Sequence, residues 1–358
     1  MNYRQRQARL REELQRHRLD ALVVSHPANV RYLCGFTGSA GVLLLTSKLS
    51  MLATDGRYRE QARQEVHGAR VRCAQGSLLA AAAAGIAKQR LRRVGMEAHR
   101  LTVGARDLLA GLLPAKARLR PTAGLVERLR MIKEPEEVER LRKAVILASS
   151  LFEPLLRLVR PGVSERDLAA ELEYLARRAG ASAMSFPTIV AAGARSALPH
   201  GIASSQPIPN KGFVIVDFGV ILADYCSDMT RTVFLGRPSR RDRELYRAVL
   251  EAQQSALAVV QPGVAAGSVD RAARRVLQRA GLARYFPHST GHGVGLEIHE
   301  PPRLGSGEKE VLKPGMVITV EPGVYIAKRG GVRIEDMVVL TENGCEVLTP
   351  TSKELITL

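Results

Sequence analysis

Residues 211–236 read KGFVIVDFGVILADYCSDMTRTVFLG and decide the fold of the larger part of the chain. Two strand-like apolar runs, GFVIV and TVFL, stand at the ends of this stretch, a pattern typical of an antiparallel hairpin. With its centre between Leu222 and Ala223, the hairpin is predicted to set Asp217 directly opposite Asp228. Like charges in directly opposed positions destabilise a sheet. We therefore expect a cation between these two carboxylates.

The same geometry recurs near the end of the sequence. Residues 315–326 read GMVITVEPGVYI, and residues 330–340 read GGVRIEDMVVL. A hairpin centred at Lys328 sets Glu321 opposite Glu335. Any one of these acids alone is more simply explained as a turn residue, a helix cap or a surface ion pair. Together, the two hairpins are predicted to bring four carboxylates toward one cleft.

The two hairpins belong to two similar halves of this part of the chain. Pro161-Gly162-Val163 recurs as Pro262-Gly263-Val264, and Phe186-Pro187 recurs as Phe286-Pro287. The interval of about 100 residues exceeds the roughly 20–50 residues of solenoid repeats. Each half reads as two helices followed by strands. We expect an α+β architecture, in which two helix-covered antiparallel sheets enclose a cleft.

A metal ion is the usual means of holding several carboxylates together, because burying an uncompensated carboxylate costs several kcal/mol. Imidazoles stand nearby: residues 288–300, HSTGHGVGLEIHE, contain His288, His292 and His299. His292 lies between two glycines, which allow close approach, so we expect it to be a metal ligand. Ligation by oxygens and one imidazole suits Mn²⁺, Co²⁺, Fe²⁺ or Zn²⁺, whereas oxygens alone favour Mg²⁺ or Ca²⁺.

The first 125 or so residues alternate helical and strand patterns, which predicts a separate α/β domain. The alanine-rich segment 80–87, AAAAAGIA, is predicted to be a buried helix, because alanine is the best helix former. A helix opening at Pro135, with acidic residues in its first turn, marks the start of the second domain. We therefore expect two domains.

Composition narrows the class of protein. The chain has 358 residues, of which 46% are hydrophobic and 25% charged, as in an ordinary globular protein. The net charge is +18 but aromatic residues make up only 4%, so nothing resembles a base-stacking surface, and nucleic acid is not expected as the main partner. No run of about 18 apolar residues predicts a membrane span, and the Met1 end, MNYRQRQARL, is charged and does not read as the apolar region of a signal peptide. With four dispersed cysteines, these features predict a cytoplasmic protein.

Several blocks of the sequence resemble the pita-bread metallopeptidases, in the branch of Xaa-Pro aminopeptidases and Xaa-Pro dipeptidases (prolidases). The blocks are SFPTIVAAGARSALPHG, VDFGVILADYCSDMTRT, YFPHSTGHGVGLEIHEPP, GMVITVEPGVY and GGVRIEDMV. The earlier segments NVRYLCGFTGSAG and TDGRYREQA are similar to the smaller creatinase-like domain of this branch. The resemblance implies a creatinase-like N-terminal domain over residues 1–128 and a pita-bread catalytic domain over residues 129–358.

The resemblance also implies roles for individual residues. Five positions match the ligands of two divalent ions per subunit, with two of them, Asp228 and Glu335, bridging both ions: Asp217, Asp228, His292, Glu321 and Glu335. The outer histidines match residues that bind substrate and move protons: His200, His288 and His299. Arg333 and Tyr325 match residues that line the same pocket. Glu321 is in addition a plausible acceptor for the proton of the attacking water.

The activity implied is hydrolysis of the N-terminal Xaa-Pro bond of a peptide or dipeptide with proline at the second position. Mn²⁺ is the metal first expected, followed by Co²⁺, Zn²⁺ or Fe²⁺, and the family implies a homodimer. The sequence does not decide between a dipeptidase and an aminopeptidase. Arg303 is a candidate for binding the free carboxylate of a dipeptide. Two functions without peptidase activity also stay open: a creatinase-like amidinohydrolase without metal, and a module that binds nucleic acid or ribosomes.

Overall fold

The computed structural model describes every residue from Met1 to Leu358, and the chain divides into two compact units, Met1–Arg130 and Met131–Leu358. The first unit is built around a six-stranded mixed sheet in the order β4-β3-β2-β1-β5-β6. The strands are β1 (Ala21–Val24), β2 (Gly41–Thr46), β3 (Ser50–Thr54), β4 (Arg70–Cys73), β5 (Arg93–Glu97) and β6 (Arg118–Thr122). The helices are α1 (Tyr3–Arg16), α2 (Pro27–Cys34), α3 (Arg59–Glu65), α4 (Leu78–Lys88), α5 (Val103–Leu112) and α6 (Leu125–Met131).

The alanine-rich segment forms α4 as predicted. Ser77 caps the helix by accepting a hydrogen bond from the Ala80 backbone N–H. Ala82 and Ile86 are fully buried in the core of this unit, since they lie on the helix face that meets the sheet. The predicted α/β character of the N-terminal part is therefore confirmed.

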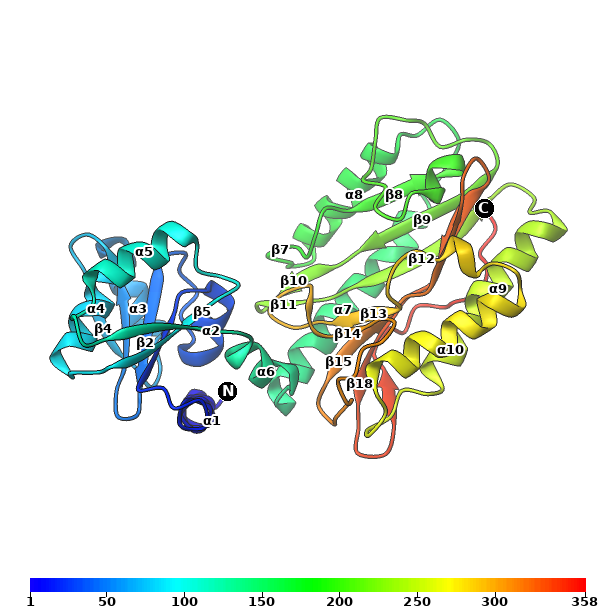
Figure 1. Cartoon of the computed structure of the whole chain (residues 1–358). Coiled ribbons are helices and arrows are strands. Elements are labelled where there is room, and N and C mark those ends of the chain that lie inside the picture. Colours follow the sequence, from blue (N-terminus) through cyan, green and yellow to red (C-terminus); the bar gives the residue numbers. More distant parts are fainter. The chain divides into compact units, whose positions relative to one another are not determined.

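The second unit contains the two predicted halves, each with two helices followed by strands (Figure 1). The first half comprises α7 (Pro135–Leu156), α8 (Glu165–Arg178), β7 (Ala183–Met184), β8 (Ile189–Ala192), β9 (Gly212–Phe218), β10 (Val220–Leu222), β11 (Tyr225–Cys226) and β12 (Met229–Leu235). The second half comprises α9 (Arg240–Leu257), α10 (Ala266–Arg279), β13 (Gly291–Gly293), β14 (Glu300–Leu304), β15 (Val317–Val320), β16 (Gly323–Ile326), β17 (Gly330–Arg333), β18 (Asp336–Leu340) and β19 (Cys345–Val347). No helix of the chain is both long and apolar enough to cross a bilayer.

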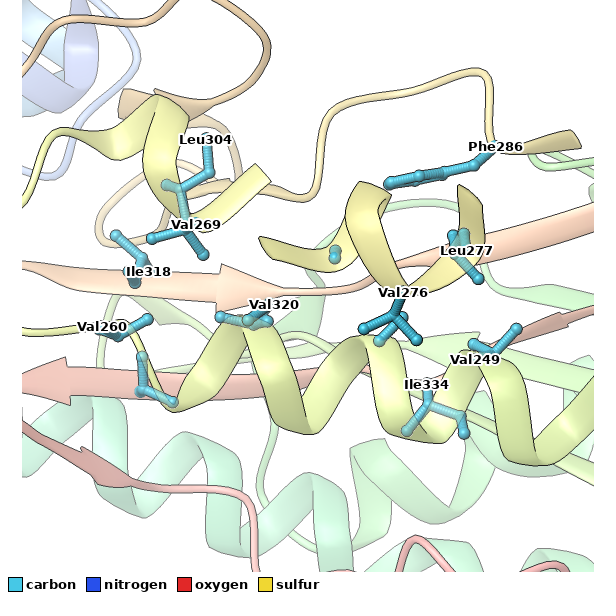
Figure 2. Packing of buried hydrophobic residues seen from close by; sticks show 14 of the residues in the cluster. Val249, Val260, Val269, Val276, Leu277, Phe286, Leu304, Ile318, Val320 and Ile334 are labelled. Atoms are coloured by element: carbon cyan, nitrogen blue, oxygen red, sulfur yellow. The ribbon is translucent and has the colours of Figure 1, made fainter. Parts of the chain in front are cut away.

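Each helix pair buries its apolar face against the strands of its own half. Side chains of α7 and α8 pack on β8, β9 and β12 in one core cluster. Side chains of α9 and α10 form a second cluster with β15 and β18, in which Val249, Val269 and Val276 meet Ile318 and Val320 (Figure 2). The strands are thus fixed from outside, which leaves their opposite faces free to carry polar side chains.

The register of the first hairpin differs from the prediction. Asp217 pairs with Thr230, and Met229 pairs with Phe218, so the hairpin centre lies one residue further along than expected. The cause is the turn at Ala223 and Asp224, which both have positive φ (48° and 75°) and form a tight two-residue connection. Asp228 therefore stands diagonally from Asp217 rather than opposite it. Both side chains still belong to the same sheet face, because side chains alternate with a period of two.

The second hairpin has the predicted register. Gly323 pairs with Arg333 in β16 and β17, and Val320 pairs with Asp336 in β15 and β18. Both pairings are centred on Lys328, the predicted position, and they flank Glu321 and Glu335. The two glutamates consequently lie where the chain passes from one strand pair to the next.

Candidate active site

A cavity of about 690 Å³ lies within the second unit and takes its lining from both halves. Apolar side chains form part of its wall: Phe186, Pro187, Ile189, Pro199, Ile202, Ile298 and Pro301. Ser289 and a set of charged and imidazole side chains form the rest: His200, Asp217, Asp228, His288, His292, His299, Glu300, Arg303, Glu321, Arg333 and Glu335. Concave sites with an apolar wall and a few convergent polar groups are the usual form of a small-ligand site.

Carboxylates from both halves meet one imidazole in this cavity. Donor atoms of Asp228, His292 and Glu335 all lie within 4.8 Å of one another. His292 Nε2 is 3.5 Å from Asp228 Oδ2 and 3.5 Å from Glu321 Oε1. His292 Nδ1 lies 3.0 Å from the Gly293 carbonyl, which favours the tautomer that leaves Nε2 unprotonated toward the carboxylates.

Two threonines orient these side chains. Thr230 Oγ1 donates a hydrogen bond to Glu335 Oε2 at 2.7 Å, while Arg333 Nε donates to Thr230 Oγ1. Thr319 accepts from the His292 backbone N–H at 3.1 Å. Both threonines are fully buried on strands next to the acids. Their role cannot be recognised in the sequence, because threonine is a common residue in strands.

Burying these carboxylates in the charged form is unfavourable, and their raised pKa values reflect this. Burial, followed by repulsion from neighbouring carboxylates, raises the pKa of Asp228 and of Glu335 well above the usual range. Burial raises the pKa of Glu321 to about 8. The buried oxygens Asp217 Oδ1 and Glu335 Oε1 have no hydrogen-bond partner. A buried polar atom without a partner is uncommon, so these oxygens point to a ligand.

Arg333 links the acids to one outer histidine through a chain of hydrogen bonds. Its guanidinium contacts Asp217 Oδ2 at 2.5 Å and donates to the Tyr325 hydroxyl at 2.6 Å. The Tyr325 hydroxyl lies 2.9 Å from His288 Nε2, and His288 Nδ1 lies 2.8 Å from the Ser289 carbonyl. The proton therefore sits on Nδ1, and Tyr325 donates to Nε2. Burial lowers the pKa of His288 to about 4 and raises that of Tyr325 to about 12.

The structure brings nine of the ten predicted site residues to the cavity surface: His200, Asp217, Asp228, His288, His292, His299, Glu321, Arg333 and Glu335. Tyr325 differs from the prediction, since it is 7% exposed and lies behind Arg333 and His288 instead of lining the cavity. The His292 and His299 rings contact each other edge to face, with centroids 4.4 Å apart. Arg303 also lines the cavity.

Comparison with known proteins identifies the fold. The pattern of metallopeptidase family M24 matches residues 139–342, more than half of the chain. The chain belongs to the M24 metallopeptidases. Residues 6–132 match the creatinase/prolidase N-terminal domain. The predicted α+β pita-bread architecture with a creatinase-like domain in front is thereby confirmed.

Three relatives show the extent of the likeness. The uncharacterized peptidase YqhT of Bacillus subtilis is 42% identical over 95% of this chain and 96% of its own length. An Xaa-Pro dipeptidase structure from Bacillus anthracis has a TM-score of 0.97 and 41% identity, and covers 100% of both chains. An X-Pro aminopeptidase structure from Thermotoga maritima has a TM-score of 0.89 and 34% identity, over 97% of this chain and 100% of that one.

The donor set of this M24 chain fits divalent metal ions. Four carboxylates and one imidazole converge, and the single positive charge of Arg333 cannot neutralise all four carboxylates. Two of their buried oxygens have no hydrogen-bond partner in the protein. Burial lowers the pKa of His292 to about 4, which keeps its ring neutral, as a metal ligand must be. M24 membership and this donor set favour a peptidase over an amidinohydrolase or a binding module.

Proposed function

We propose that this M24 metallopeptidase hydrolyses the N-terminal Xaa-Pro bond of peptides or dipeptides with the help of two divalent ions. The observation that carries the proposal is the buried cluster of Asp228, His292 and Glu335 beside two partnerless carboxylate oxygens. The names of related proteins supply the substrate: an Xaa-Pro dipeptidase from Bacillus anthracis and an X-Pro aminopeptidase from Thermotoga maritima.

Five residues are proposed to hold the ions, with Asp228 and Glu335 shared between both: Asp217, Asp228, His292, Glu321 and Glu335. When bound, a pair of such ions supplies a hydroxide near neutral pH and polarises the scissile carbonyl. Mn²⁺ is proposed as the native metal. Thr230 supports the arrangement by occupying one oxygen of Glu335, so that the other oxygen stays available.

The chain's own groups are proposed to handle the protons. Glu321, whose pKa burial raises to about 8, is suited to accept a proton from the attacking water near neutral pH. His288, held neutral by burial, accepts from Tyr325, which accepts from Arg333; this chain is suited to hold in place the Arg333 guanidinium, whose positive charge can stabilise the developing oxyanion. His200 and His299 also line the cavity, and they are proposed to supply the proton that a leaving prolyl nitrogen needs.

The wall of the cavity bears on the choice between dipeptidase and aminopeptidase. A dipeptide ends in a carboxylate next to proline, and a guanidinium is the group best shaped to hold it. Arg303 lines the cavity and is the proposed clamp. If Arg303 serves this role, dipeptides are preferred; otherwise longer peptides are accepted equally well.

Two further properties are proposed along with the activity. A homodimer is proposed from family resemblance. A reducing compartment such as the cytoplasm is supported by the four cysteines, none of which forms a disulfide: Cys34, Cys73, Cys226 and Cys345.

The test is hydrolysis of Ala-Pro and of Ala-Pro-Ala by purified protein, first stripped with chelator and then reloaded with Mn²⁺ or Co²⁺. Metal-dependent cleavage that Asp228→Ala abolishes is the expected result. The ratio of the rates on the two substrates decides between dipeptidase and aminopeptidase. If neither substrate is cut with any metal, the proline specificity is wrong.

A further inference from the structure

One buried carboxylate fastens both ends of the segment 192–204 in the first half. Glu165 begins α8 and is 1% exposed. Its Oε1 accepts a hydrogen bond from the Ala192 backbone N–H at 2.9 Å. Its Oε2 accepts from the Ser204 backbone N–H at 3.1 Å, from the Ser204 hydroxyl at 2.6 Å and from Arg195 Nε at 2.9 Å. Arg195 in turn donates to the Ile202 carbonyl, which closes the segment on itself.

This segment carries His200 and Ile202 into the cavity wall. The His200 side chain is exposed, so its position depends chiefly on the backbone of its segment. Arg333 supports the same segment by donating to the Pro199 carbonyl at 3.0 Å. Ser196 Oγ also accepts from the Gly331 backbone N–H at 2.9 Å, so the middle of the segment is held to the second half and Glu165 holds its two ends. Loss of the Glu165 carboxylate would therefore loosen the ends of the segment that carries His200.

The second half repeats the arrangement with a different acid. Asp270 lies in α10, is fully buried, and accepts from Arg274 Nε at 2.8 Å. Its other oxygen accepts from the Thr290 backbone N–H at 3.2 Å and from the Thr290 hydroxyl at 2.9 Å. Arg274 also donates to the carbonyls of Phe286 and His288, at 3.0 and 2.5 Å. The segment so fixed, 286–290, carries His288.

We propose that Glu165 and Asp270 are positioning residues with equivalent duties in the two halves, each holding one outer histidine, His200 or His288, over the cavity. A buried carboxylate is expensive, and an apolar side chain would fill either place at lower cost. Ionised acceptors form the stronger hydrogen bonds that can fix irregular backbone, and the second helix of each half presents such an acceptor to its histidine segment. This proposal rests on the proposed peptidase activity.

The test uses Glu165→Gln and Asp270→Asn, which keep the side-chain shape but set an amide N–H against existing donors. Displacement of a catalytic group by about 1 Å costs roughly 10²-fold in rate, so each variant is expected to lose about that factor in kcat/KM on Ala-Pro. In a His200→Ala background, Glu165→Gln is expected to cost less than about threefold, because the histidine through which it acts is absent. Asp270→Asn should behave likewise in a His288→Ala background. When Glu165→Gln is combined with His288→Ala, or Asp270→Asn with His200→Ala, the fold-losses in kcat/KM of the two single variants should multiply.

Two measurements and two further variants separate positioning from a general loss of structure. Metal content should stay at the wild-type value, and hydrogen exchange should quicken at least about tenfold in segment 192–204 or 286–290 alone. Should Glu165→Gln fold poorly, the milder variant Ser204→Ala replaces it. Ser204→Ala is expected to lose less kcat/KM, and this loss should likewise disappear in the His200→Ala background. Glu173→Gln is the control on the same helix, α8. Glu173 accepts only from Thr188, which lies outside segment 192–204, so the kcat/KM of this variant should equal that of the wild type.

Two results would overturn the proposal. One is equal loss of kcat/KM in the presence and absence of the corresponding histidine, and the other is wild-type hydrogen exchange in the variants. If the wild-type enzyme cuts neither Ala-Pro nor Ala-Pro-Ala, the proposed activity itself fails. Hydrogen exchange then still decides whether the two carboxylates hold the segments, so the two failures are distinct.

Discussion

The ion pair between Lys133 and Glu300 offers a sharp test of how charge is buried near the cavity. Lys133 Nζ is 3.2 Å from Glu300 Oε2, and each side chain is 2% exposed. At this distance and an effective dielectric constant of about 20, the attraction is about 5 kcal/mol. Removing one partner leaves the other charge buried, which typically costs about 3–5 kcal/mol. Glu300→Gln is therefore expected to lower the free energy of unfolding of the unit Met131–Leu358 by about 3 kcal/mol or more.

Differential scanning calorimetry with saturating Mn²⁺ measures the effect. For a unit of this size, 1 kcal/mol shifts the Tm by about 2–4 °C, so a decrease of about 6–12 °C is expected. The matched control is Glu139→Gln at the exposed pair of Glu139 and Lys143, whose side chains are 55% and 65% exposed. An exposed pair contributes about 0–1 kcal/mol, so this variant should change the Tm little.

The double variant Lys133→Met with Glu300→Gln completes the cycle. Because no charge is then left buried, it should recover most of the stability that either single variant loses. The reasoning is refuted if Glu300→Gln shifts the Tm no more than Glu139→Gln does. It is equally refuted if the losses of the two single variants simply add.

Four further predictions concern protons, metal and substrate. Burial lowers the pKa of His288 to about 4, below the value of about 6.5 in an unfolded chain. Between these pH values only the unfolded chain binds this proton, so the contribution of His288 to the free energy of unfolding falls as the pH falls. The raised pKa values of Asp228, Glu321 and Glu335 act in the opposite direction, so the test is a comparison of two proteins. In urea unfolding of metal-free protein, lowering the pH from 7 to 4 should stabilise the wild type less, or destabilise it more, than His288→Gln. Asp228→Asn should weaken Mn²⁺ binding at least about 10²-fold in equilibrium dialysis, since even supporting residues of metal sites contribute 10–100-fold. Restoring Mn²⁺ to about 100 times its Kd after chelation should add about 2.7 kcal/mol, a rise in Tm of about 5–11 °C in calorimetry. Arg303→Ala should raise the rate on Ala-Pro-Ala relative to Ala-Pro; an unchanged ratio excludes the clamp.

The two hairpins show where sequence reasoning succeeds and where it errs. The second register was predictable because the glycine-rich turn around Lys328 lies midway between Glu321 and Glu335. The first register was wrong because the turn uses Ala223 and Asp224 at positive φ, without the Asn-Gly or Asp-Gly pair that announces such a turn. The error left the site intact, because opposed and diagonal positions on neighbouring strands share one face.

The supporting residues lay beyond the reach of the sequence for a physical reason. Glu165 stands in the first turn of a helix, where an acidic residue is favoured by the helix dipole whether or not it binds anything else. Thr230 contacts Glu335, a residue more than a hundred positions away, through a side chain that any strand could carry. Periodicity and spacing report local structure, whereas these contacts depend on how the two halves meet. The acids and histidines were predictable because their chemistry is conspicuous wherever they stand.

The division of the proposed metal ligands between the halves links folding to function. The first half supplies Asp217 and Asp228, and the second supplies His292, Glu321 and Glu335, so joining the halves brings like charges together in a buried place. Burial and mutual repulsion raise the pKa of Asp228 and Glu335, which means that the metal-free protein holds them at the expense of stability. The apolar cores that each half builds with its own helices must supply that stability. A bound cation removes the repulsion and is held by side chains of both halves. Variants that weaken metal binding are therefore expected to weaken the association of the two halves as well, and the reverse.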